Sequence, residues 1–340
     1  MANLKKIPVT LLTGFLGAGK TTFLNHLIQE NKQVRYAIIE NEFGEQSIDN
    51  ELVVNPDNSI IAQNNGCLCC TLNDNLYDIL NELHDRRDEY DEIIIEATGV
   101  ADPSGLAQPF LSHSLIKEHF PLVNIICLVD AELVESHLEE TEEALNQIVF
   151  SDLLLINKTD LVTEDYVESL QSKLKVLNPL ARIAKGNKQT FPSIAWQETQ
   201  GQLETIFQQQ GALQTLSAAD SFPVQKPHSH HHHSHTQDVV SHTFTFDQPF
   251  SGVLLDRQLF IYLMLQSAGL YRMKGLVWLE GENRQFIVQS VGKRLDIEPK
   301  RLWELTEERH STVVFIGKSL KREGLEKLLQ KCLSKNSRHT

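Results

Sequence analysis

The chain has 340 residues, 41% of them apolar, and a formal net charge of −14 at pH 7. This length is sufficient for two domains with a substantial core. The acidic balance excludes a nucleic-acid partner held by bulk electrostatics, and no apolar run approaches a membrane span. Five cysteines, three of them close together, and an N-terminus without an apolar signal region predict a cytoplasmic protein.

The first predicted element is an apolar strand at residues 7–12, followed by a glycine-rich segment and a helical pattern. The segment fits the P-loop pattern G-x-x-x-x-G-K-[ST], whose glycines let several backbone N–H groups face one phosphate chain. Lys20 is expected to reach the β- and γ-phosphates, and the Thr21 hydroxyl to hold Mg²⁺. The predicted phosphate-binding residues are Gly14, Gly17, Ala18, Gly19, Lys20, Thr21 and Thr22.

A short strand at residues 35–39 leads into the acidic stretch Glu40-Asn41-Glu42-Phe43-Gly44-Glu45. Residues 52–61 are predicted to form an irregular hairpin at the sheet edge. The stretch Gly66-Cys67-Leu68-Cys69-Cys70 follows, and apolar residues at helical spacing then predict a helix at residues 72–83.

The cysteines Cys67, Cys69 and Cys70 can converge on one soft or borderline metal ion. A structural zinc site usually takes four ligands, so three thiols leave a position for Glu40 or Glu45, or an open one suited to passing the metal on. His113 is a further candidate ligand, although a single histidine at a helix end is more often structural. The alternative for the thiols is apolar burial, which the neighbouring Asn64-Asn65 and Gly66 disfavour.

Two later strand ends carry chemistry. Glu96 follows the buried strand Ile93-Ile94-Ile95, where P-loop enzymes place an acid for the Mg²⁺ shell, and the Gly99 N–H is expected at the γ-phosphate. Asn157-Lys158-Thr159-Asp160 follows another apolar strand. An aspartate there can accept both the N1–H and the amine of guanine, which predicts GTP rather than ATP. No residue is assigned to position the attacking water, so slow intrinsic hydrolysis is expected.

Strands continue to alternate with helices as far as residue 184, which predicts a doubly wound, mostly parallel α/β sheet. The predicted elements are a helix that begins at Pro103, a strand at 123–129, one helix before a strand at 153–156, a helix at 164–177 and a strand at 181–184.

We predict three regions: a P-loop domain at residues 1–210, a flexible linker at 211–241 and a small α+β domain at 242–335. The linker contains the run His228 to His235, broken by serines, which suits metal collection. A hydrophilic spacer and an engineered tag are the alternatives. In the last domain, strands are predicted at 242–246, 275–279, 285–289 and 312–316, and helices at 257–266 and 320–332.

Together these motifs resemble the CobW-like family of P-loop GTPases, whose members handle metal ions. The likeness spans about residues 5–210, and the part containing Lys274-Gly275 and Val314-Phe315-Ile316-Gly317 resembles the family's small second domain. The carrying segments are Gly14 to Thr22, Glu40 to Glu45, Gly66 to Cys70, Glu96-Ala97-Thr98-Gly99, Ala101-Asp102-Pro103 and Asn157 to Asp160.

The resemblance implies GTP hydrolysis coupled to delivery of a transition metal, most often zinc, to a client metalloprotein. It places the metal on Cys67, Cys69 and Cys70, with Glu40, Glu45 or His113 as possible further ligands. Co²⁺, Ni²⁺ and Fe²⁺ remain open as the metal. A GTPase that activates a cobalt or iron enzyme and a nucleotide-gated metal buffer or sensor are the alternatives, and an oligomer is compatible with all of them.

Overall fold

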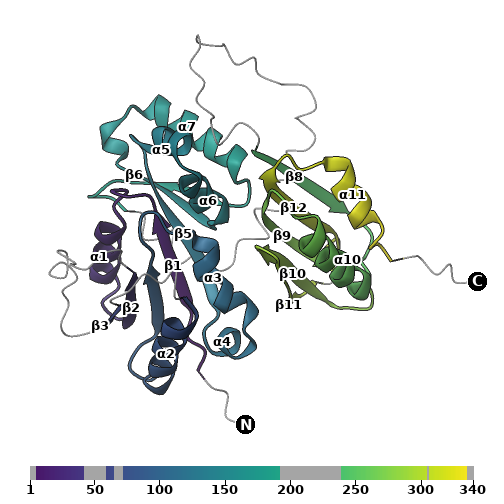
Figure 1. The fold of residues 1–340 in the computed structure, drawn as a ribbon, viewed down its shortest axis with the longest axis horizontal. Helices are drawn as coiled ribbons and strands as arrows, with labels where there is room; N and C mark the ends of the chain where they lie inside the picture. The colour runs from purple at the N-terminus through teal and green to yellow at the C-terminus, as the bar shows by residue number, and fades with distance from the viewer. Residues whose placement is uncertain (1–4, 42–58, 65–71, 192–238, 305, 335–340) are drawn as a thin grey trace, which may run out of the picture. The chain divides into compact units, whose positions relative to one another are not determined.

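The computed structural model describes residues 5–41, 59–64, 72–191, 239–304 and 306–334 (Figure 1). The chain divides into two compact units, one within residues 1–200 and one within residues 201–340. The linker expected at 211–241 lies outside the described residues except for its last three, which already belong to a strand. Within the described ranges, no helix combines the length and the apolarity needed to cross a bilayer.

The N-terminal unit contains a seven-stranded sheet of order β3-β2-β4-β1-β5-β6-β7, and its strands pair in parallel. This confirms the doubly wound α/β fold. The strands are β1 (Val9–Gly14), β2 (Tyr36–Asn41), β3 (Ser59–Asn64), β4 (Glu92–Glu96), β5 (Leu122–Asp130), β6 (Leu153–Asn157) and β7 (Arg182–Lys185). The helices are α1 (Lys20–Glu30), α2 (Leu72–Asp85), α3 (Pro103–Ser112), α4 (Ser114–His119), α5 (Val134–Glu140), α6 (Glu142–Phe150) and α7 (Glu164–Leu177).

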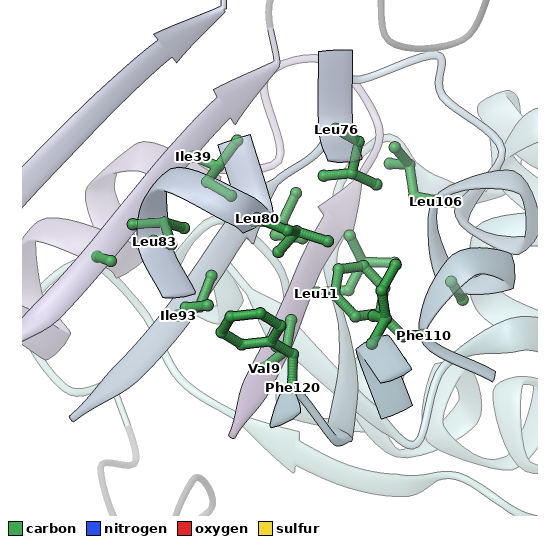
Figure 2. Packing of buried hydrophobic residues seen from close by; sticks show 14 of the residues in the cluster. Val9, Leu11, Ile39, Leu76, Leu80, Leu83, Ile93, Leu106, Phe110 and Phe120 are labelled. Carbon is green, nitrogen blue, oxygen red and sulfur yellow. The ribbon is translucent and has the colours of Figure 1, made fainter. Parts of the chain in front are cut away.

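The central strand β1 is buried at all six positions because helices cover both faces of the sheet. Val9 and Leu11 face one hydrophobic cluster, which contains α2, α3 and α4 residues, and Leu12 faces another with α1. Figure 2 shows the first cluster, with Leu80 and Phe110 packed over β1. Each such side chain stabilises the fold by about 1.5–3 kcal/mol through burial. The parallel strands therefore deliver their carboxyl ends to one fixed edge, where ligands bind in such sheets.

Two local predictions need comment. The predicted hairpin at residues 52–61 lies outside the described residues except for its last three, which belong to β3; β3 pairs in parallel with β2, from Tyr36 opposite Ser59 to Asn41 opposite Asn64. The single helix expected before β6 is two helices, α5 and α6. Thr141 separates them because its extended backbone (φ −136°) ends α5, while its hydroxyl accepts a hydrogen bond from Ala144 N and caps α6.

The C-terminal unit is the expected small α+β fold, a five-stranded antiparallel sheet of order β11-β10-β9-β12-β8. Its strands are β8 (Val239–Phe246), β9 (Leu270–Trp278), β10 (Arg284–Val291), β11 (Arg294–Leu302) and β12 (Ser311–Lys318). Two helices, α10 (Gly252–Leu265) and α11 (Arg322–Gln330), share a hydrophobic core with the sheet (Figure 1).

Candidate nucleotide and metal site

The P-loop joins the central strand β1 to α1 in a backbone conformation that suits glycine. Gly19 has φ 98°, in the left-handed region. A β-carbon at Gly19 would also lie 2.5 Å from Nδ2 of Asn157. This close approach places the start of α1, with its free N–H groups, beside the end of β6.

Lys20 points back into the loop. Its Nζ donates to the carbonyl oxygen of Gly14 at 2.8 Å and lies 3.4 Å from that of Phe15. Burial lowers the pKa of the Lys20 ammonium, and the nearby Glu96 carboxylate partly opposes this by favouring the charged form. The loop therefore fixes one cation at the point where phosphate oxygens are expected.

Thr21 and Glu96 meet at the sheet edge. The Thr21 hydroxyl donates to Oε1 of Glu96 at 2.9 Å, and Glu96 ends β4 directly opposite Leu12 of β1. Adjacent ligands of an octahedral ion with bonds of 2.0–2.1 Å lie about 2.9 Å apart. The two oxygens therefore have the chemistry and the spacing that Mg²⁺ requires.

The predicted guanine loop is tied directly to the P-loop. The Asn157 carboxamide donates from Nδ2 to the carbonyl oxygen of Ala18 at 2.8 Å. Lys158 has φ 61°, a left-handed conformation. Its ammonium lies 2.6 Å from Oδ2 of Asp130, whose other oxygen accepts from Glu132 N at 3.0 Å. Asp130 ends β5, so the ion pair anchors the loop to two neighbouring strands.

Asp160 is held with its side chain exposed at the start of the turn after β6. The preceding Thr159 donates through both its N–H (3.3 Å) and its hydroxyl (3.0 Å) to the carbonyl oxygen of Gly186, just after β7. Within the described part of the chain, Asp160 has no hydrogen-bond or ion-pair partner. Its carboxylate is therefore available to the two N–H donors of guanine, and the segment at Lys185-Gly186 lies beside it.

We expect Asp160→Asn to weaken binding of GTP relative to xanthosine triphosphate by at least about tenfold. An amide can donate to the carbonyl that xanthine carries in place of the guanine amine. Competition between the two nucleotides for the purified protein measures the change, with the exposed Asp165→Asn as control. An unchanged preference would mean that this loop does not contact the base.

Gly99 follows β4 and packs against the P-loop. A β-carbon at Gly99 would lie 2.6 Å from the backbone N of Leu16. Gln147, on α6 and only 1% exposed, donates from Nε2 to the carbonyl oxygens of Gly99 (3.0 Å) and Ala101 (3.2 Å). One buried amide thus positions the segment whose N–H is expected at the γ-phosphate.

Replacing Gln147 by Leu is expected to destabilise the protein by about 1–3 kcal/mol, because two buried carbonyl groups lose their donor. Urea unfolding measures this, with the exposed Gln189→Leu as control. GTP hydrolysis by the folded variant should also slow, since the segment at Gly99 is no longer held. Equal urea midpoints and equal rates of GTP hydrolysis for the two variants would contradict the positioning role of Gln147.

The predicted metal ligands are only partly described. Cys67, Cys69, Cys70 and Glu45 lie outside the described residues. The backbone of Glu40 is described, and its register partners are Glu96 on β4 and Gln63 on β3. Among the residues that the structure describes, no three His, Cys, Asp or Glu side chains form a cluster that could hold a metal.

His113 has a structural role in the described fold. It separates α3 from α4, and its Nδ1 accepts from Ile116 N at 3.5 Å. Its ring lies 5.5 Å from that of Tyr77 on α2, measured between centroids. This use of Nδ1 favours the capping interpretation, while metal binding by His113 stays a prediction.

Sequence reasoning missed two positioning residues, Asp130 and Gln147. Asp130 had a usable signal, because it is an acid at the carboxyl end of an apolar strand, as Glu96 is. Gln147 had none, since one glutamine within a helical pattern is ordinary. The structure places Glu96 against Thr21, which follows Lys20 at the start of α1. It also places Asn157 and the Gly99 segment against the P-loop.

A P-loop, an acid at the end of the adjacent strand and a tethered N-K-x-D loop define a P-loop nucleotide-binding protein. The family model described as "CobW/HypB/UreG, nucleotide-binding domain" matches residues 8–185, and the "Cobalamin synthesis protein cobW C-terminal domain" matches residues 239–333. The chain belongs to the CobW/HypB/UreG family, which confirms the resemblance.

Similar proteins match over nearly the whole chain. The zinc chaperone YjiA of Escherichia coli is 33% identical over 323 residues, covering 93% of this chain and 96% of YjiA. The zinc-regulated GTPase metalloprotein activator 1 of Schizosaccharomyces pombe is 27% identical, and the match covers 94% of this chain and 84% of that protein. The crystal structure of Zn(II)-bound YjiA GTPase from E. coli superposes with a TM-score of 0.69 at 29% identity, covering 97% of this chain and 100% of that one.

Proposed function

We propose that this protein hydrolyses GTP and uses the nucleotide cycle to bind Zn²⁺ and deliver it to a client metalloprotein. The observation that carries the proposal is the sheet edge, where the Thr21–Glu96 pair lies next to the end of β2 at Glu40. The acidic stretch begins there, and the cysteine segment follows β3. The zinc chaperones and the zinc-regulated GTPase activator among the similar proteins support zinc over cobalt or iron.

In the proposed hydrolysis, different residues at this edge of the sheet bind the phosphates and the Mg²⁺ ion. Lys20 and the N–H groups at the start of α1 bind the phosphates, Thr21 and Glu96 would hold Mg²⁺, and the Gly99 segment meets the γ-phosphate. When bound, the ion supplies charge neutralisation at the β- and γ-phosphate oxygens. Water attacks the γ-phosphorus, the bond to the β–γ bridging oxygen breaks, and GDP and phosphate leave.

Zinc is the cargo, and the thiolates of Cys67, Cys69 and Cys70 are its proposed ligands. A reducing compartment, proposed here to be the cytoplasm, keeps them available. Thiolate binding releases protons, so zinc affinity should fall as pH falls. The run at His228 to His235, which also lies outside the described residues, is proposed as a weaker collecting arm.

Strand register supplies the link between nucleotide and zinc. Glu40 is opposite Glu96 in the parallel β2–β4 pair, so the two backbones are about 4.8 Å apart. If Glu40 contributes to the zinc shell, its strand neighbour is the carboxylate proposed for Mg²⁺. Nucleotide and zinc affinities must then change each other by the same factor.

The test is zinc affinity by chelator competition, with a non-hydrolysable GTP analogue and with GDP. A coupling of roughly 1–3 kcal/mol predicts a five- to 150-fold difference between the two states. Identical affinities would exclude nucleotide-driven delivery. Steady-state hydrolysis with and without Zn²⁺ separates a chaperone from a buffer, because a buffer releases metal without multiple turnovers.

The matched control is the triple Cys67→Ser, Cys69→Ser, Cys70→Ser variant, which should lose the tight site and still bind GTP. Stoichiometry must be counted in each variant. A YjiA variant in which one glutamate and two consecutive cysteines are replaced by alanine is also a Zn(II)-bound structure, at a TM-score of 0.68. Loss of affinity, rather than loss of all zinc, is therefore the relevant result.

A further inference from the structure

The C-terminal unit has a groove of about 540 Å³ between α10 and α11. Both helices contribute to the core that lies on one face of the five-stranded sheet (Figure 1). Apolar atoms of Ile261, Leu325 and Leu328 line the groove, and the amides of Gln258 and Gln266 flank it. All lining residues belong to this unit, so the groove is independent of the nucleotide site.

Positive charge is concentrated on one wall. Lys321, Lys327 and Lys331 line the groove, and no Asp or Glu does, in a chain whose net charge is −14. All three lysines are exposed, and within the described residues none of them has an ion-pair or hydrogen-bond partner for its ammonium group. The charged side chains that line the groove are therefore all cationic, although the protein as a whole is acidic, and this favours an acidic ligand.

One polar side chain of the groove, Tyr262, has no hydrogen-bond partner for its hydroxyl among the described residues. Tyr262 is 8% exposed and lines the groove, and its ring packs edge-on against Phe315. Burial raises the pKa of the phenol, so the hydroxyl stays protonated as a donor. Because Tyr262 lines the groove and its hydroxyl oxygen is not a buried atom, the hydroxyl is available to a ligand there.

An exposed apolar stripe of α10 adjoins the groove at Ile261, which is one of the lining residues. Leu254, Ile261 and Leu265 are 37%, 37% and 76% exposed, and their spacing of 7 and 4 residues places them on one stripe of α10 together with Gln258. This stripe is about 16 Å long, and the row from Lys321 to Lys331 is about 15 Å long, at 1.5 Å per residue. Both lengths correspond to about three turns of a ligand helix.

We propose that this lysine-rimmed groove docks an amphipathic helix with an acidic flank, presented by the client metalloprotein. An apolar helix face would pack on the Leu254–Leu265 stripe while carboxylates reach the lysines and the Tyr262 hydroxyl, which is the helix-in-groove mode of recognition. That the partner is a client rests on the proposed function. The groove's preference for an acidic helix does not.

The probe is a fluorescein-labelled peptide of about four helical turns, with leucines at i, i+4, i+7 and i+11 and glutamates on the flank. Binding to the full-length protein is followed by anisotropy at pH 7.5, with EDTA so that zinc cannot bridge carboxylates to histidines or thiols. Binding should weaken as salt increases. A peptide with lysines in place of the glutamates should bind at least about tenfold more weakly.

The principal variant is Lys321→Glu, Lys327→Glu, Lys331→Glu, which should bind the acidic peptide at least about tenfold more weakly. The matched control, Arg284→Glu, Lys293→Glu, Arg294→Glu, makes the same charge change at exposed positions of β10 and its hairpin. Its affinity should be that of the wild type. Tyr262→Phe should weaken binding by about three- to tenfold through one lost hydrogen bond, and it keeps the test decisive if the triple variant does not fold.

Equal affinities of the two triple variants, no binding by the wild type, or equal binding of the lysine peptide would each overturn the proposal. Hydrolysis and zinc affinity are measured on the same proteins and should not change. If hydrolysis and zinc affinity are intact but the peptide does not bind as expected, only the docking proposal is contradicted. If the peptide binds as expected but hydrolysis or zinc binding is absent, the proposed function is contradicted and the docking proposal is retained.

Discussion

Lys20→Ala is expected to lower the rate of GTP hydrolysis by at least about 10²–10³-fold, because the group that stabilises developing charge on the transferred phosphate is lost. The Lys20 ammonium donates to the Gly14 carbonyl oxygen at 2.8 Å and is thereby held within the loop. The fold should be retained, since the removed ammonium is only partly buried and its hydrogen bonds go to the carbonyl oxygens of Gly14 and Phe15 within the same loop. Single-turnover kinetics measures the chemical step directly, and nucleotide titration measures binding.

The control is Lys188→Ala, at an exposed position after β7. The expected separation is a large fall in kcat for Lys20→Ala and wild-type kinetics for Lys188→Ala. A fall in affinity alone, with kcat unchanged, would assign Lys20 to uniform binding of the nucleotide. Wild-type turnover would remove the P-loop assignment.

The second large effect is expected from Glu96→Gln, which keeps an oxygen for the Thr21 hydroxyl and removes the charge. The Mg²⁺ concentration for half-maximal hydrolysis should rise by about 10–100-fold, as when a partner of a metal ligand is lost. Titration of activity with Mg²⁺ measures this. Glu139→Gln, at an exposed position of α5, is the matched control.

The same variant has a pH signature with a defined sign. The Glu96 carboxylate raises the pKa of the Lys20 ammonium against the larger lowering by burial. Without that charge the pKa of Lys20 falls further, so the ammonium deprotonates at lower pH. The alkaline limb of the rate profile should therefore move to lower pH in Glu96→Gln. An unmoved limb with an unchanged Mg²⁺ requirement would show that Glu96 does not act at this site.

The α/β architecture follows from the sequence because buried parallel strands are nearly continuous apolar runs, and α7 was predicted at residues 164–177, where it lies. Strand order was harder to predict. The pattern at β3 does not show which neighbour it pairs with, and a parallel partner requires a crossover rather than a turn. β11 was missed because Pro299 and alternating charges hide a half-exposed edge strand.

The site was predicted as residue types and not as contacts. Local spacing identifies Lys20, Thr21 and Asp160, since each belongs to a short motif with a fixed mechanism. The Asp130–Lys158 pair joins residues 28 apart, and the Gln147 bond to Gly99 joins residues 48 apart. Only the assembled sheet determines such pairs. The assigned roles stay predictions until the variants are measured.

The bond from Asn157 to the Ala18 carbonyl has a consequence for how a nucleotide is chosen. It fixes the distance between the loop that would contact the base and the loop that would contact the phosphates. Two subsites at a fixed separation bind a ligand more tightly when its base and its phosphates are already joined at that separation, because translational and rotational freedom is then lost only once. Guanosine and a free polyphosphate would each lose that freedom separately. We therefore expect the site to select the length of the nucleotide together with its chemical groups.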